Sequence, residues 1–589
     1  WPPRKRGTGA VRPTAESEAL DGAGSSRPSG TLGKVVSQGS ASRKEETPEA
    51  RQLRQKCRRA ADRLRVVLST WDAAVAACTE APLQPGRGPG VPRRILVWHQ
   101  SVRRKLIRIA ATQGVERVVR ELKDFSADAR GAWINRSRPS HHLWRSCPEP
   151  ERSRESWWAQ MSFVGRSLPT GSSRQEEEAL TRHKRDLTST FTTDPALLRD
   201  LQSWVTTWAR HHLPSRPSWT HVAHLPAGSS ATFEKRRSKG GFAKAAEELL
   251  ASCGELDSEK PVELTHATWA RLNSELRVVQ AAFEDRWSLP PRGRVATVSE
   301  RGHKVRVVTA MQPHALILGD FARRRLLLGL RKWPMAKTVL KGDAREVVRE
   351  LVGSEGQVVS SDLRASTDLI PFDVIDAILG GLEDSGRLLP LELQGLRLCT
   401  GVQRITWPDG ETRDTSRGIM MGLPTSWSLL NLYHGWCWEA AKLTDPVRGP
   451  GVPGRVGRSV ARICGDDLIG STSPSGKAAY DARLCASGAE LSDGKHFFSP
   501  DRGVFLEVLW EFRGTRVARV EGDIPIYRTI RRTRRGGLRR RVRVLVNSHK
   551  LHRWTSIFPL PAMPLKGLVA GEAPFTTHSN EAPDWWAAG

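Results

Sequence analysis

Two adjacent carboxylates stand between two apolar stretches in the segment Arg458–Ser471, which reads RSVARICGDDLIGS. The pattern predicts a β-hairpin with Gly465, Asp466 and Asp467 at its tip. An ordinary turn would explain these residues, because Gly and Asp are both common in turns. Neighbouring carboxylates repel each other, however, unless a cation lies between them. A metal site is therefore the functional alternative.

A further carboxylate, Asp362, lies 104 residues before Asp466 (466 − 362 = 104). The preceding QVVSS predicts a short strand that ends at Asp362. Residues 371–382 follow with Pro in the first turn and apolar residues on one face, which predicts a helix. Asp368 lies between strand and helix, and either helix capping or a role in function would explain it.

A glycine-containing loop and a long apolar segment lie between these carboxylates, in SRGIMMGLPTSWSLLNLYH at residues 416–434. The spacing predicts a loop followed by a helix that extends to Leu443. Ser426 and Asn431 are polar within the apolar run, so each needs a hydrogen-bond partner. Either the backbone or a bound substrate could provide it.

A basic strand is predicted at residues 298–309, VSERGHKVRVVT. Alternation along a strand places Lys304 and Arg306 on one face. The two cations could bind an anion together, or they could protect an exposed edge strand.

Taken in chain order, the segments resemble the motifs of viral RNA-dependent RNA polymerases, in particular those of ourmia-like viruses (botourmiaviruses) and narnaviruses. The basic strand resembles motif F, DLRASTD motif A, MGLPTSWSLLN motif B and CGDD motif C. LSDGKHFFSPDRGVFLE at 491–507 resembles motif D, with Lys495 as its lysine, and the motif that follows it. The resemblance covers residues 290–515.

The resemblance implies an α+β fold, the right-hand polymerase with fingers, palm and thumb, an antiparallel palm sheet and a helix-rich N-terminal region. The expected regions are a disordered basic tail (1–52), an N-terminal helical region contributing to the fingers (53–260), fingers with motif F (261–357), a palm with motifs A to E (358–515) and a thumb or basic C-terminal region (516–589). Helical periodicity is visible from about residue 53 to 125. No clear period marks residues 126–240.

The same resemblance assigns the chemistry of nucleotidyl transfer. Asp362 and Asp466, with Asp467 adjacent, are expected to hold two Mg²⁺ ions, for which Mn²⁺ could substitute. Lys495 is expected to give a proton to the leaving pyrophosphate, although a solvated loop lysine is the simpler interpretation.

Five residues are expected to contact the incoming nucleotide. Lys304 and Arg306 would neutralise its triphosphate. Asp368, Ser426 and Asn431 would contact its 2′-hydroxyl, which both donates and accepts hydrogen bonds.

The charge of the chain points to a polyanionic partner. Among 589 residues, 92 Lys and Arg stand against 63 Asp and Glu, for a net charge of +29. Such an excess favours nucleic acid, so RNA template and product are the expected partners, with nucleoside triphosphates as substrates. No apolar run is long enough to span a membrane. The expected location is the host cytoplasm, and no protein partner can be identified.

Nine arginines and no acidic residue lie between residues 528 and 543. This run would bind RNA phosphates or form a solvated tail. The arginines expected to bind RNA are Arg531, Arg532, Arg534, Arg535, Arg539, Arg540 and Arg541.

Two other functions fit parts of the sequence. A reverse transcriptase carries the same carboxylate pair, but its turn usually begins with an aromatic residue instead of CGDD, and Ser426 and Asn431 favour ribose. A non-catalytic basic RNA-binding protein explains the charge but not the three aspartates. The eight scattered cysteines contain no CxxC pair, which predicts free thiols and no structural zinc.

Overall fold

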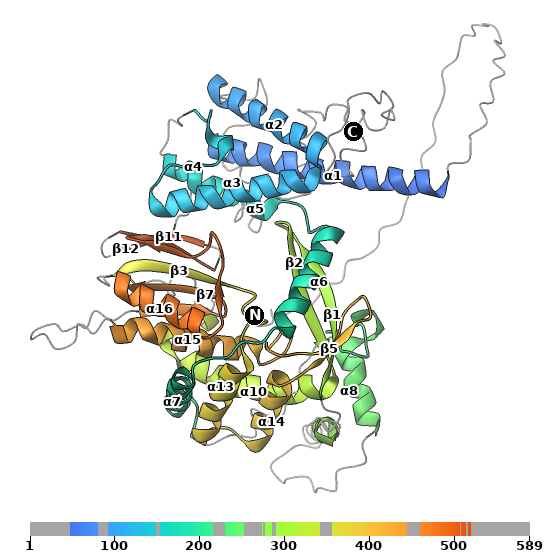
Figure 1. Ribbon diagram of the computed structural model, residues 1–589, viewed down its shortest axis with the longest axis vertical. Coiled ribbons are helices and arrows are strands. Elements are labelled where there is room, and N and C mark those ends of the chain that lie inside the picture. Colours follow the sequence, from blue (N-terminus) through green and yellow to red (C-terminus); the bar gives the residue numbers. More distant parts are fainter. Residues whose placement is uncertain are drawn as a thin grey trace, which may run out of the picture. The chain divides into compact units, whose positions relative to one another are not determined.

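The computed structural model describes residues 47–79, 92–148, 154–215, 230–252, 274, 277–284, 290–341, 351, 356–444, 460–506, 508–513 and 516–519. The predicted tail up to residue 46, the arginine run 528–543 and nearly all of region 516–589 lie outside these residues. The described chain begins with helices and continues with helices and mostly antiparallel sheets, which confirms the α+β class (Figure 1). No described helix has the length and apolar character that crossing a membrane requires.

Three long helices begin the described chain: α1 (Pro48–Thr79), α2 (Arg93–Gln113) and α3 (Val115–Asn135). Their apolar faces meet around Trp71, whose ring lies 5.2 Å from that of Trp98 and 5.5 Å from that of Phe125. The prediction of a helix-rich N-terminal region is confirmed. Helix α1 begins at Pro48, five residues before the expected region starts at residue 53, and a proline is favourable in a first helical turn.

The stretch without a clear sequence period, and the residues that follow it up to Ser252, also form helices. They are the 3₁₀ turns η1 (His142–Trp144) and η3 (Arg237–Lys239), and the helices α4 (Arg154–Met161), α5 (Val164–Ser167), α6 (Ser173–Thr188), α7 (Pro195–His212) and α8 (Gly241–Ser252). Capping signals mark two of the starts. Ser172 and Gln175 form a capping box at α6, and Asp194 caps α7 before a first-turn proline.

The basic strand belongs to a four-stranded sheet in the order β2-β1-β4-β5. Its strands are β1 (Arg292–Glu300), β2 (Lys304–Met311), β4 (Arg404–Thr406) and β5 (Thr412–Asp414). β1 and β2 form an antiparallel hairpin, and β2 lies at the edge of the sheet. Helices α10 (Pro313–Lys332) and α11 (Pro334–Lys341) follow.

A second sheet carries the predicted carboxylates. Its order is β6-β7-β3-β8, and β9 also pairs with β3. The strands are β3 (Gln357–Arg364), β6 (Val460–Cys464), β7 (Asp467–Thr472), β8 (Glu490–Leu491) and β9 (Phe497–Ser499). A further sheet contains β10 (Arg502–Phe505), β11 (Val508–Arg513) and β12 (Arg516–Arg519).

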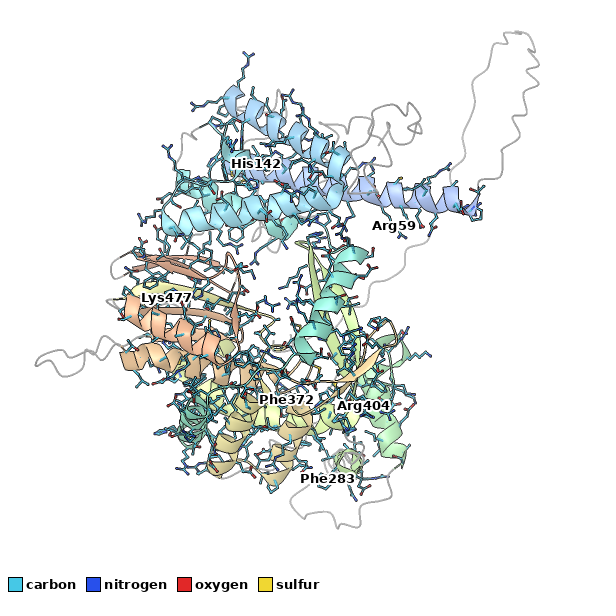
Figure 2. The ribbon with its side chains drawn as sticks, in the orientation of Figure 1. Arg59, His142, Phe283, Phe372, Arg404 and Lys477 are labelled. Carbon is cyan, nitrogen blue, oxygen red and sulfur yellow. The ribbon has the colours of Figure 1, made fainter. Side chains whose placement is uncertain are left out.

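A large apolar core packs helices against the sheet of β3. The helices are α7, α10, α11, α13 (Phe372–Asp384), α14 (Pro390–Thr400), α15 (Ser426–Thr444) and α16 (Pro474–Ala486). In Figure 2, Phe372 marks the start of α13 and Lys477 lies on α16. On the sheet, a side chain at Gly470 would come within 2.5 Å of the Trp438 ring of α15, so the helix approaches the strand closely.

Candidate active site

The three predicted carboxylates meet at one end of the β3 sheet. β6 and β7 form the expected hairpin, and Asp467 is the first residue of β7. Asp362 on β3 pairs directly with Asp467 in the antiparallel register. Asp466 lies in the turn, where its carbonyl accepts a hydrogen bond from the Leu363 N–H at 3.3 Å. Two segments that are distant in sequence thus bring their carboxylates to the same strand ends.

Side chains of α15 hold the turn. Gly465 has φ +70°, a conformation that glycine adopts readily. Its N–H donates to Asn431 Oδ1 at 3.1 Å, and its carbonyl accepts from His434 Nδ1 at 2.8 Å. The Tyr480 hydroxyl then donates to His434 Nε2 at 2.6 Å. Burial lowers the pKa of His434 to about 4, so the neutral imidazole that these bonds require is the stable form.

The electrostatics of the carboxylates disfavour their charged forms. Burial, reinforced by Asp362, raises the pKa of Asp466. Burial also raises the pKa of Asp467 to about 8, with repulsion from both other aspartates, although the Leu506 N–H donates to its Oδ2 at 2.6 Å. A divalent cation would stabilise the charged forms, and carboxylates are the donors that Mg²⁺ prefers. The residues present therefore fit a divalent metal.

Lys495 currently provides the positive charge. Its Nζ donates to Asp362 Oδ2 at 2.8 Å, while half of the lysine side chain is exposed. The loop that carries it is held next to β3 by the Ser492 N–H, which donates to the Asp362 carbonyl at 2.9 Å. Lys495 is thus within reach of the site, as the resemblance implied, while proton donation to pyrophosphate stays a prediction.

Lys304 lies near the carboxylates, and Arg306 is paired. Burial, together with repulsion from Arg306 and Lys495, lowers the pKa of Lys304, and attraction to Glu300 and Asp362 opposes this change. Arg306 donates from Nε to Glu300 Oε2 at 2.8 Å. Of the two predicted triphosphate ligands, Arg306 would therefore exchange a partner within the hairpin for the substrate.

The three predicted sugar contacts already have partners within the protein. Asp368 lies in the loop before α13 and does not cap that helix, which starts after Pro371. The Thr367 hydroxyl donates to Asp368 Oδ1 at 3.0 Å, and burial raises the pKa of Asp368 to about 7. Ser426 Oγ donates to the Ile419 carbonyl at 2.6 Å.

The loop before α15 lies against motif A. The Ile419 N–H donates to the Thr367 carbonyl at 2.7 Å, so Ser426 and Asp368 are linked through this loop. Asn431 is fully buried and donates from Nδ2 to the Trp427 carbonyl at 2.6 Å. The backbone thus satisfies Ser426 and Asn431, and contact of the three residues with a 2′-hydroxyl stays a prediction.

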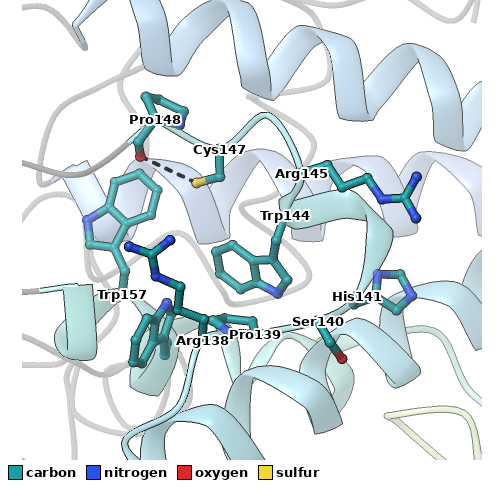
Figure 3. A pocket seen from close by; sticks show the side chains of 10 residues that line it. Arg138, Pro139, Ser140, His141, Trp144, Arg145, Cys147, Pro148 and Trp157 are labelled. Atoms are coloured by element: carbon teal, nitrogen blue, oxygen red, sulfur yellow. Dashed lines mark hydrogen bonds between the residues drawn. The ribbon is translucent and has the colours of Figure 1, made fainter.

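A different cluster has metal-like geometry but lies among the N-terminal helices. Within the part of the chain that the structure describes, only Glu121, His141 and His142 form a triad whose ligand atoms all lie within 4.8 Å. The Glu121 carboxylate is already paired with Arg117. His141 also lines a cavity of about 280 Å³ beside Trp144 (Figure 3), and none of the predicted site residues lines it. None of the seven described cysteines forms a disulfide.

Comparison with known proteins places these motifs in context. The chain is 41% identical over 533 residues to the RNA-directed RNA polymerase of Saccharomyces 20S RNA narnavirus, covering 90% of this chain and 62% of the relative. The chain is similar to narnavirus RNA-directed RNA polymerases. The enzyme of Saccharomyces 23S RNA narnavirus is 31% identical over 487 residues, covering 77% of this chain and 50% of that relative. The predicted resemblance is thereby confirmed.

The chain spans only half to two thirds of the length of these relatives. Among solved structures, the RNA-dependent RNA polymerase of a human picobirnavirus aligns with a TM-score of 0.42 and 12% identity, covering 59% of this chain and 64% of that one. No known family model matches the sequence.

Proposed function

We propose that the chain is an RNA-directed RNA polymerase, a nucleotidyltransferase that copies a positive-strand viral RNA genome. One observation carries this proposal: Asp362 is directly opposite Asp467, with Asp466 in the adjoining turn. Carboxylates on neighbouring strand ends can hold divalent cations next to a primer end and a nucleotide. The similarity to narnavirus polymerases over 90% of the chain supports the same assignment.

Asp362, Asp466 and Asp467 would hold two Mg²⁺ ions, which when bound would activate the primer 3′-hydroxyl and stabilise the charge on the leaving group. Asn431 and His434 fix the backbone of the turn and so keep two of these carboxylates in position. Lys495 would release Asp362 when the metal arrives and would then be free to donate its proton to pyrophosphate.

The remaining residues would recognise the substrates. Lys304 and Arg306 neutralise the triphosphate, while Asp368, Ser426 and Asn431 contact the ribose after one internal partner is exchanged. The sheet of β3 acts as the palm, the β1–β2 hairpin belongs to the fingers, and the thumb follows residue 515. The arginine run binds the RNA backbone, and replication takes place in the host cytoplasm.

Primer extension on an RNA template tests the proposal. We expect incorporation of ribonucleotides in Mg²⁺, no incorporation in a chelator, and little with deoxyribonucleotides. Asp362→Ala and Asp466→Ala should abolish extension while leaving the fold intact by circular dichroism. Asp62→Ala is a matched control, because this exposed carboxylate lies on α1 and pairs only with Arg65 among the described contacts.

Near-normal turnover of Asp466→Ala in Mg²⁺ would contradict the metal assignment. Preferential use of deoxyribonucleotides would indicate a reverse transcriptase. RNA binding without extension under any of these conditions would leave only the non-catalytic RNA-binding function.

A further inference from the structure

Helix α3 connects the basic hairpin to the sheet that carries the carboxylates. Near the middle of the helix, Lys123 Nζ donates to the carbonyl of His303, in the β1–β2 turn, at 3.3 Å. At its end, the carbonyl of Ile134 accepts from Ser499 Oγ of β9 at 2.9 Å. Figure 1 shows α3 extending across both regions. An N-terminal helix thus spans the two elements between which a nucleotide would bind.

Two cations lie on the same face of this helix. Lys123 and Arg130 are seven residues apart, which is close to two helical turns. The Arg130 guanidinium is near enough to Asp362 and Asp467 for their charges to raise its pKa, although burial lowers the pKa more strongly. Partial desolvation of the Lys123 ammonium, together with repulsion from Lys495, lowers the pKa of Lys123, although the side chain keeps solvent-exposed surface. Arg130 is therefore coupled electrostatically to the carboxylates, and Lys123 is coupled to Lys495, which itself pairs with Asp362.

The surrounding protein leaves part of the hydrogen-bonding capacity of these two cations open. Lys123 is exposed to solvent and Arg130 is half-buried. Arg130 donates to the Ser162 carbonyl at 3.2 Å, but its Nε is buried and has no hydrogen-bond partner among the described residues. A guanidinium with an unused donor beside solvent-accessible cations is suited to a phosphate group.

The cations that are coupled to the carboxylates, directly or through Lys495, come from separate parts of the chain. They are Lys123 and Arg130 of α3, Lys304 of β2, and Lys495 of the loop before β9. Once metal ions neutralise the aspartates, the positive charges of these four side chains would no longer be balanced by nearby carboxylates. The triphosphate of a nucleotide would provide the missing anion.

We propose that Lys123 and Arg130 of α3 bind the triphosphate of the incoming nucleotide, opposite the metal-binding aspartates. This inference rests on the proposed polymerase function and extends it to a helix outside the motifs. It makes the N-terminal helical region a part of the active site. Since α3 also contacts the β1–β2 turn, triphosphate binding would hold the hairpin and the β3 sheet together.

Direct binding of a non-reacting phosphate ligand tests the inference. Inorganic tripolyphosphate with Mg²⁺ is titrated into the full chain by calorimetry, and the KM for ribonucleotides is measured in primer extension. Arg130→Gln and Lys123→Gln should each weaken tripolyphosphate binding about tenfold or more, because a hydrogen bond between charged groups is lost. The KM should rise by a similar factor, with a smaller change in kcat.

Arg108→Gln provides the matched control, since it removes one exposed charge from α2. Arg130→Lys keeps the charge and should recover part of the binding, which separates phosphate contact from a structural role. Unchanged tripolyphosphate binding and KM in both Gln variants, with the parent chain active, would overturn the inference alone. If the parent chain binds tripolyphosphate through Arg130 but extends no primer, the result supports the phosphate-binding site and contradicts the polymerase function.

Discussion

Replacing Asn431 with Ala should lower both the stability of the chain and its rate of RNA extension. The side chain is 0% exposed, accepts a hydrogen bond from the Gly465 N–H at 3.1 Å and donates one to the Trp427 carbonyl at 2.6 Å. Ala removes both bonds and leaves the turn N–H without its acceptor. A buried polar group that loses its partner costs about 1–3 kcal/mol, so we expect the free energy of unfolding to fall by about that amount.

The assay combines denaturant unfolding, followed by Trp fluorescence, with primer extension using ribonucleotides and deoxyribonucleotides. If Asn431 acts only through the turn that carries Asp466, extension falls by the same factor with both sugars. If it also contacts the 2′-hydroxyl, the preference for ribonucleotides falls as well, chiefly through slower ribonucleotide incorporation.

Ser428→Ala is the matched control on the same helix. Its hydroxyl is fully buried but has no hydrogen-bond partner among the described residues, so its removal breaks no bond. We expect a change in unfolding free energy close to zero or slightly stabilising. An Asn431→Ala chain as stable as the parent would refute the supporting role of the amide.

Three further perturbations test the electrostatics. Asp467→Asn should raise the midpoint of thermal unfolding in a chelator, because it removes a carboxylate whose burial raises its pKa to about 8. The same change should lower Mg²⁺-dependent extension at least about 100-fold. Equal unfolding midpoints of the variant and the parent chain would contradict this reasoning. Burial lowers the pKa of His183 from 6.5 to about 4, so the unfolded chain binds more protons and stability falls as the pH decreases from 6.5 to 4. His183→Gln should weaken that pH dependence in denaturant titrations, and an identical pH profile would rule the histidine out as its source. Changing Arg531, Arg532 and Arg534 to Gln should reduce the slope of log K against log salt for single-stranded RNA by about 2, whereas an unchanged slope would favour a solvated tail.

The parts of the site that could be predicted from sequence are those encoded by local pattern. Apolar residues on both sides of a Gly-Asp-Asp turn specify a hairpin, whichever other strands pair with it. Strands β6 and β7 form this hairpin. The strand before Asp362 extends two residues further than predicted, to Arg364, because pairing with β8 continues it. Local periodicity contains no information about that partner strand.

Contacts between distant segments could not be predicted in the same way. Neither the apolar pattern nor the spacing shows that His434 binds the Gly465 carbonyl 31 residues away, or that Lys123 contacts the β1–β2 turn 180 residues later. Helix α3 has an ordinary amphipathic sequence, and its cations look like solvated surface residues until the fold places Arg130 near Asp362 and Asp467, and Lys123 near Lys495. Tertiary packing alone brings these charges close to one another.

The polar residues of α15 show why residue type leaves function open. An amide in an apolar helix must be satisfied, and the sequence allows either backbone or substrate to satisfy it. The structure provides backbone partners for both ends of the Asn431 amide, one of them in the turn next to Asp466. Any contact with a ribose would therefore exchange a bond that holds the catalytic turn. Sugar recognition and carboxylate position would then be coupled through one side chain, so that the bound sugar influences the geometry of metal binding.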